Sequence, residues 1–149
     1  FMNQIMTGRP LTVFGDGEQT RAFSYVGDVA PYIARSVDHA GAYGETFNIG
    51  ADKPYSVNEL ARVVSREFGA DLQVQHLPPR IEVVDAWASH EKASRVFGSG
   101  ERTSLDEGIA RMAAWAKRIG ARSGKAFENI EVERNLPPSW RETASTAVS

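Results

Sequence analysis

One continuous segment carries most of the structural information in this sequence, and it reads Gly15-Asp16-Gly17-Glu18-Gln19-Thr20-Arg21-Ala22-Phe23-Ser24-Tyr25-Val26-Gly27-Asp28-Val29-Ala30. Just before it, Leu11-Thr12-Val13-Phe14 combines β-branched and aromatic residues, which are typical of a strand. The Gly-Asp-Gly triplet then predicts a tight turn. Residues 22–26 alternate in polarity like a second strand. The segment therefore predicts a strand, a turn and a further strand.

Downstream, the signals alternate between helices and a short strand. Asp28 is expected to cap a helix over residues 29–40, and residues 45–50 are expected to form a strand. Ser56 and Glu59 have the spacing of a capping box, in which each side chain satisfies the other residue's backbone N–H group. The helix that follows should bury one face through four apolar residues, Leu60, Val63, Val64 and Phe68.

The remaining elements complete a small α+β unit. Residues 72–76 alternate like a half-buried strand, and residues 90–97 suit a short helix. A longer helix is expected to begin near Ser104 and end at Gly120, with a buried stripe of Ile109, Met112, Ala113 and Ile119. Residues 1–120 should thus form one unit. Residues 121–149 are expected to be an extended arm, placed over Phe127 to Trp140 against a neighbouring surface, and a frayed tail.

Composition excludes several classes of function. The 149 residues carry 17 Lys plus Arg against 19 Asp plus Glu, a net charge of −2, so no bulk positive field would attract nucleic acid or an anionic membrane. Without cysteine there is no disulfide or thiolate metal site, and the three histidines lack metal-ligand spacing. No segment is apolar enough to span a bilayer. We expect a cytoplasmic protein that binds neither nucleic acid, membrane nor metal.

The order of several motifs resembles the extended short-chain dehydrogenases/reductases, the NAD-dependent epimerases and dehydratases of nucleotide sugars. The resemblance covers about residues 1–120. It rests on residues 10–30 together with four later segments in the same order: Phe47-Asn48-Ile49-Gly50, Ser56-Val57 with Glu59-Leu60, Pro79-Arg80, and Thr103-Ser104-Leu105-Asp106-Glu107-Gly108-Ile109. One departure is Arg80-Ile81-Glu82-Val83, where the family usually has a glycine before the acidic residue and one residue more.

The resemblance implies a binding site for a nucleoside diphosphate sugar, such as a UDP-sugar. Arg21 and Arg80 would bind the diphosphate, for which a guanidinium offers permanent charge and a fork of donors. Without the resemblance, each arginine is better explained as a surface ion pair. Glu82 would approach the ribose hydroxyls. Gln19 would bond near the substrate, or else serve as a solvated turn residue.

The strand before the turn would meet the nucleobase. By resemblance, the backbone of Thr12 and Val13 would face the base edge and the ring of Phe14 would lie alongside it. The alternative is a core strand in which Phe14 is simply packed. Gly15 and Gly17 are assigned to the turn itself, because a single Gly-x-Gly is not a dinucleotide fingerprint.

Two absences indicate that this is only the C-terminal portion of such an enzyme. None of the tyrosines has a lysine four residues later, so the family's catalytic Tyr-x-x-x-Lys pair is missing. The glycine motif that holds NAD after a strand is missing too. Residues 1–6 read as the end of a helix without an N-cap, which suggests a truncated start. The N-terminal Rossmann domain would be absent, with neither catalytic nor NAD-binding residues in this chain.

The sequence therefore predicts the substrate-binding part of an NAD-dependent sugar epimerase, most similar to UDP-glucose 4-epimerase, that is inactive by itself. The parent enzyme would bind NAD and form a homodimer. A 4,6-dehydratase or UDP-glucuronate decarboxylase of the same family is one alternative. A non-catalytic nucleotide-binding or subunit-interaction module is another.

Overall fold

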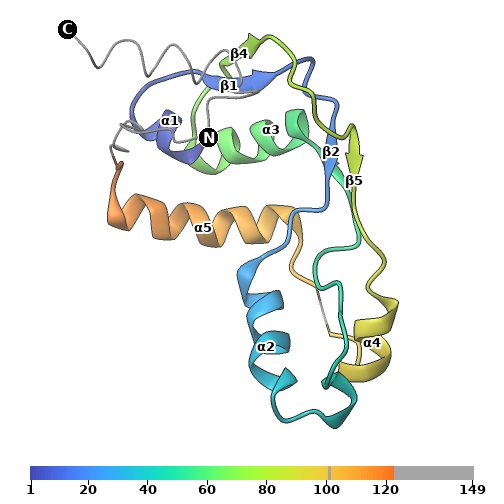
Figure 1. The fold of residues 1–149 in the computed structure, drawn as a ribbon. Coiled ribbons are helices and arrows are strands. Elements are labelled where there is room, and N and C mark those ends of the chain that lie inside the picture. The colour runs from blue at the N-terminus through green and yellow to red at the C-terminus, as the bar shows by residue number, and fades with distance from the viewer. Residues whose placement is uncertain (101, 123–149) are drawn as a thin grey trace, which may run out of the picture.

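The computed structural model describes residues 1–100 and 102–122. The expected arm over Phe127 to Trp140 and the tail therefore lie outside the described residues. Helices and short strands mix in the described part, which confirms the expected α+β class (Figure 1). None of the helices in these two ranges is both long and apolar enough to cross a membrane.

The helices with strong local signals form as expected. Helix α3 (Val57–Phe68) begins at a complete capping box of Ser56 and Glu59 and ends at Gly69, which has the left-handed φ of 62°. Helix α5 (Leu105–Ile119) begins where the Ser104 hydroxyl accepts from the Glu107 N–H group. Two short helices, α1 (Met2–Met6) and α4 (Glu91–Phe97), lie within the ranges expected for them.

Two small sheets connect distant parts of the chain. Strand β1 (Leu11–Phe14) pairs in parallel with β4 (Val74–Leu77), which begins two residues later than expected. Strand β2 (Thr20–Arg21) lies between β3 (Tyr55–Ser56), which is antiparallel to it, and β5 (Asp85–Ala86), which is parallel. The second sheet brings residues near 20 and residues near 85 side by side.

Three predictions in the first half of the chain are wrong. The second strand is β2, and it ends at Arg21, before the predicted range begins. Residues 22–25 are irregular because the pairing with β3 and β5 stops at Arg21. Helix α2 (Val26–Ser36) begins earlier than expected, and Asp28 lies in its first turn without capping it. The Asp28 carboxylate instead accepts from the backbone and the hydroxyl of Thr103, both at 2.8 Å. Residues 45–50 form no strand.

The main core lies where α3 and α5 pack together. It consists of Val64, Leu105 and Ile109, with partly buried residues of α1 and α3 around them. Ala113 is buried as expected, but Met112 and Ile119 are 49% and 44% exposed, so the predicted stripe of α5 is only half correct. Those two side chains line an apolar groove together with residues of α1 and α3.

A second, smaller cluster holds the other end of the molecule together. There α2 and α4 lie beside each other, next to the 3-10 helix η1 (Ala40–Ala42), at the opposite end from α1 (Figure 1). The ring of Phe97 contacts two others edge to face, that of Tyr32 at 5.8 Å and that of Phe47 at 5.1 Å between centroids. Strands β2 and β5 join this end to the α3–α5 layer.

Candidate functional site

The turn after β1 is fixed by two glycines and one asparagine. Gly15 and Gly17 have φ angles of 70° and 79°, a region that side chains disfavour. A Cβ on Gly17 would collide with the side-chain amide of Asn58. That amide donates to the Asp16 carbonyl at 2.9 Å and to the Glu18 carboxylate at 2.7 Å, which ties the turn to α3. These glycines serve the turn, and neither lies at the start of a helix that could cradle a phosphate.

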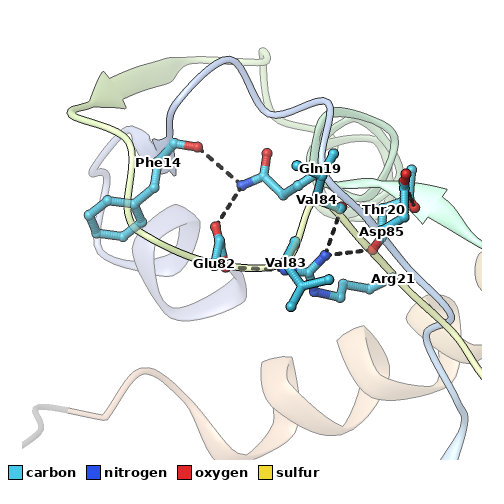
Figure 2. A network of polar contacts seen from close by, with 8 residues as sticks. All are labelled: Phe14, Gln19, Thr20, Arg21, Glu82, Val83, Val84 and Asp85. Atoms are coloured by element: carbon cyan, nitrogen blue, oxygen red, sulfur yellow. Dashed lines mark hydrogen bonds and ion pairs between the residues drawn. The ribbon is translucent and has the colours of Figure 1, made fainter.

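Arg21 is the most heavily bonded side chain of this region. Its guanidinium donates to three carbonyl groups, Thr20 at 2.6 Å, Val84 at 3.1 Å and Val83 at 2.7 Å. It also forms an ion pair with the Glu82 carboxylate at 3.2 Å. Figure 2 shows the guanidinium aimed at the segment before β5. The side chain of Arg21 points to this segment because β2 and β5 run alongside each other here.

Gln19 joins the end of β1 to the same segment. Its Nε2 atom donates to the Phe14 carbonyl at 3.1 Å and to Glu82 Oε1 at 3.2 Å. One oxygen of the Glu82 carboxylate thus bonds to Gln19 and the other to Arg21 (Figure 2). The Glu82 carboxylate therefore bridges Gln19, which follows the turn, and Arg21 of β2.

Arg80 contacts the aromatic ring of Phe14. Its guanidinium carbon lies 3.3 Å from the ring centroid of Phe14, a close cation–π contact. The end of β4 brings Arg80 there, since the Gly15 N–H group donates to the Leu77 carbonyl at 2.9 Å and Pro79 lies against Gly15. The two arginines are thus connected through residues 80–84 without contacting each other in any recorded interaction. Arg21 bonds to that segment, and Arg80 is part of it.

Thr12 and Val13 lie apart from this cluster. Val13 is buried in the core as a whole residue, at 1% exposure, so neither its side chain nor its main chain is open to a ligand. The Thr12 hydroxyl accepts from Gln4 at 3.0 Å, on the side of α1. A chain of contacts thus links Phe14, Gln19, Arg21, Arg80 and Glu82. The sequence-based assignment of Val13 to a ligand-facing main chain is wrong, because the residue is fully buried.

Several partners of this cluster were not identified from the sequence. Asp85 accepts from the Thr20 hydroxyl at 2.6 Å, and the carbonyl groups of Val83 and Val84 hold Arg21. Backbone carbonyl groups carry no sequence signal, and a two-residue strand such as β5 has too few residues to show alternation. The β-branched pair Val83-Val84 is the one sequence feature here that favours a strand.

The chemistry available here is recognition of an anion. The guanidinium of Arg80 offers a forked donor to an oxyanion, whereas Arg21 would have to release Glu82 to offer one. The ring of Phe14 is half-buried and carries Arg80 over one face. Among residues 1–100 and 102–122, no group of three or more His, Asp or Glu residues is arranged to hold a metal ion. The 149 residues contain no Tyr-x-x-x-Lys.

Comparison with known proteins identifies the family of the chain. Residues 1–50 match the model of the NAD dependent epimerase/dehydratase family. A UDP-glucuronate 4-epimerase of Thermodesulfobacterium geofontis is 29% identical over 91% of this chain and 39% of its own length. A UDP-glucose 4-epimerase of Mycolicibacterium smegmatis is 31% identical over 74% of this chain and 36% of its own length. Other relatives are dehydratases and a decarboxylase of UDP sugars.

A solved structure gives the same fold. The UDP-glucuronic acid 4-epimerase of Bacillus cereus, in complex with UDP-glucuronic acid and NAD, superimposes with a TM-score of 0.73 and 27% identity. The match covers 79% of this chain and 38% of that structure. The chain thus spans about two fifths of the length of its relatives. On sequence and fold together, the chain belongs to the NAD-dependent epimerase/dehydratase family of extended short-chain dehydrogenases/reductases.

Proposed function

We propose that this chain binds the nucleoside diphosphate of a UDP-sugar, as the substrate-binding part of a 4-epimerase. Two contacts support the proposal: Arg21 bonds to Glu82 and Val83, in the segment that Arg80 begins, and the guanidinium of Arg80 lies over the ring of Phe14. A diphosphate needs two or more forked cationic donors, and a pyrimidine needs a flat apolar neighbour. The relatives named above act on UDP-sugars, which agrees with this ligand.

Each residue has a distinct part in the proposal. Arg21 and Arg80 bind the diphosphate oxygens. Phe14 lies against the uracil, while the main chain of the half-buried Thr12 meets its polar edge. Glu82 accepts from the ribose hydroxyls once it leaves Arg21. Gln19 holds the end of β1 and the acidic residue in register with each other.

The chemistry of the sugar would take place in the rest of the enzyme. In the proposed reaction, C4 of the sugar is oxidised and then reduced on the other face, and NAD supplies the hydride acceptor when it is bound. The residues described here do not fit NAD, because the left-handed glycines pack against Asn58 and Pro79 instead of opening a helix. This chain binds and orients the substrate and carries out no step itself. A dehydratase or decarboxylase would use the same binding residues.

Calorimetric titration of the 149-residue chain with UDP tests the proposal. We expect weak binding by the wild type and a loss of about tenfold or more for Arg21→Ala and Arg80→Ala, since a hydrogen bond to a charged group contributes about 1.5–3 kcal/mol. Arg95→Ala is the matched control, because Arg95 lies on α4 with its side chain 71% exposed. Equal UDP affinity in all four proteins would refute the assignment of the diphosphate site.

A further inference from the structure

An apolar groove lies between α1 and α5, far from the proposed nucleotide site. It has a volume of about 880 Å³ and is floored by core residues of α3 and α5. Its walls include Met112, Trp115 and Ile119 of α5, which are 49%, 52% and 44% exposed. Their spacing of three and four residues places them on one stripe of the helix. This is the part of the predicted core stripe that the described residues leave uncovered.

A contiguous apolar surface of this kind marks a site of interaction. The two ends of the described chain meet at its edge, because Phe1 and Arg122 both line the groove. The backbone of Arg122 is fixed there by two hydrogen bonds with the Asn3 side chain, at 2.8 and 2.9 Å. The guanidinium of Arg122 lies 6.0 Å from the ring centroid of Trp115. The chain therefore passes into residue 123 at the rim of the groove.

The sequence after this point has the composition that the groove requires. Between residues 127 and 140 it carries five large apolar side chains, Phe127, Ile130, Val132, Leu136 and Trp140. The same stretch has three glutamates and one arginine, whereas the last turn of α5 and the rim carry Lys117, Arg118 and Arg122. Four residues separate Arg122 from Phe127, and an extended chain covers about 3.3–3.6 Å per residue. That reach is enough to return to the walls of the groove.

We propose that residues 127–140 occupy this groove within the same chain. Their apolar side chains cover Met112, Trp115 and Ile119, and their glutamates face the basic rim. Two consecutive prolines, Pro137 and Pro138, suit an extended segment laid in a groove, since neither can donate a backbone hydrogen bond. The docked segment completes the core stripe of α5 that the sequence predicts.

The methionines provide a direct test. The sequence has three, Met2, Met6 and Met112, and all of them line the groove. Labelling the methionine methyl groups with carbon-13 in the full chain therefore gives three NMR signals that all report on the groove. Because the chain has no cysteine, Ser139→Cys accepts a single nitroxide spin label beside Trp140. We expect this label to broaden all three methyl signals.

Two controls separate docking from mere tethering. A label at Ser94→Cys on α4, at the other end of the fold, should leave the three signals sharp. Adding Leu136→Asp and Trp140→Ser to the Ser139→Cys chain keeps the label tethered but removes two apolar anchors, so the broadening should fall. Unchanged broadening in that variant, or no broadening in the first place, overturns the proposal.

The same samples distinguish a second copy as the occupant. Spin-labelled chains without carbon-13 are mixed with carbon-13 chains that lack the spin label. Docking within one chain predicts sharp methyl signals in this mixture. Broadening in the mixture would show that the groove receives another molecule and would overturn the intramolecular assignment.

Discussion

The guanidinium of Arg80 lies over the ring of Phe14, with its central carbon 3.3 Å from the ring centroid. The ring therefore positions Arg80, one of the two arginines proposed to bind the diphosphate, and it also offers a surface to a base. We predict that Phe14→Leu lowers the UDP affinity by about three- to tenfold, because aromatic contacts contribute about 0.5–1.5 kcal/mol beyond area burial. Calorimetry with UDP and with pyrophosphate separates the two roles. The base contact is absent if both ligands lose affinity equally.

Glu82 competes with the proposed ligand for Arg21. Its carboxylate pairs with the guanidinium at 3.2 Å, and the two side chains are 40% and 28% exposed. We predict that Glu82→Gln raises the affinity for pyrophosphate by about two- to fivefold, the factor that corresponds to a partly exposed ion pair. Pyrophosphate is the suitable probe because it has no ribose for Glu82 to bind. The gain should vanish in an Arg21→Ala background, and Glu91→Gln, an exposed change on α4, should leave the affinity unchanged.

Asp28 and Thr103 join the start of α2 to the start of α5. Two hydrogen bonds of 2.8 Å reach the carboxylate from one residue, through the backbone N–H group and the hydroxyl. We predict that Asp28→Ala lowers the free energy of unfolding by about 1.5–3 kcal/mol, as expected for partly buried bonds to a charged acceptor. Thr103→Val removes the hydroxyl bond alone and should cost less. Urea unfolding measures both, and a cost for Asp28→Ala no larger than for the surface change Asp38→Ala would contradict the contact.

The capping box of α3 makes stability depend on pH. The Ser56 N–H group donates to the Glu59 carboxylate at 2.7 Å, which lowers the pKa of Glu59 below its ordinary value of 4.5. Because the folded pKa is the lower one, this bond stabilises the fold fully above pH 4.5 and is lost as the pH falls through the folded pKa.

The corresponding test compares two proteins at two pH values. Urea unfolding near pH 6 and near pH 3 should show a smaller loss of stability for Glu59→Gln than for the wild type, because the amide keeps its acceptor when the pH falls. Asp106 and Glu45, whose pKa values are also lowered, by Arg66 and Lys92, contribute equally in both proteins. Identical pH dependence in both would rule out this role of the carboxylate.

Local signals predicted the helices well. The capping box at Ser56 and the left-handed Gly69 act within a few residues, so the sequence alone defines both ends of α3. Residues 22–26 were misassigned because alternation of polarity describes a possible strand but does not supply its neighbours. In the structure, those neighbours are β3 and β5, and both end at the level of Arg21.

The candidate site was predicted less completely, for a related reason. Arg21 and Arg80 were assigned by resemblance, but two of the three carbonyl groups that accept from Arg21 belong to residues more than sixty positions away. Pairing over such distances leaves no periodic trace in the sequence. Met112 and Ile119 were expected to be buried because helical spacing identifies an apolar face without naming what covers it.

The long separation between Arg21 and Glu82, 61 positions along the chain, has a consequence during synthesis. A ribosome adds about 5–20 residues per second, so Glu82 is made about 3–12 s after Arg21. Throughout that interval the guanidinium of the nascent chain has neither its carboxylate nor the Val83 carbonyl. The last residue of α3, Phe68, is added 14 residues before Glu82, and the cap of this helix is local. The bonds between Arg21 and residues 82–84 therefore form only after the whole sequence of the helix that anchors the turn has been made.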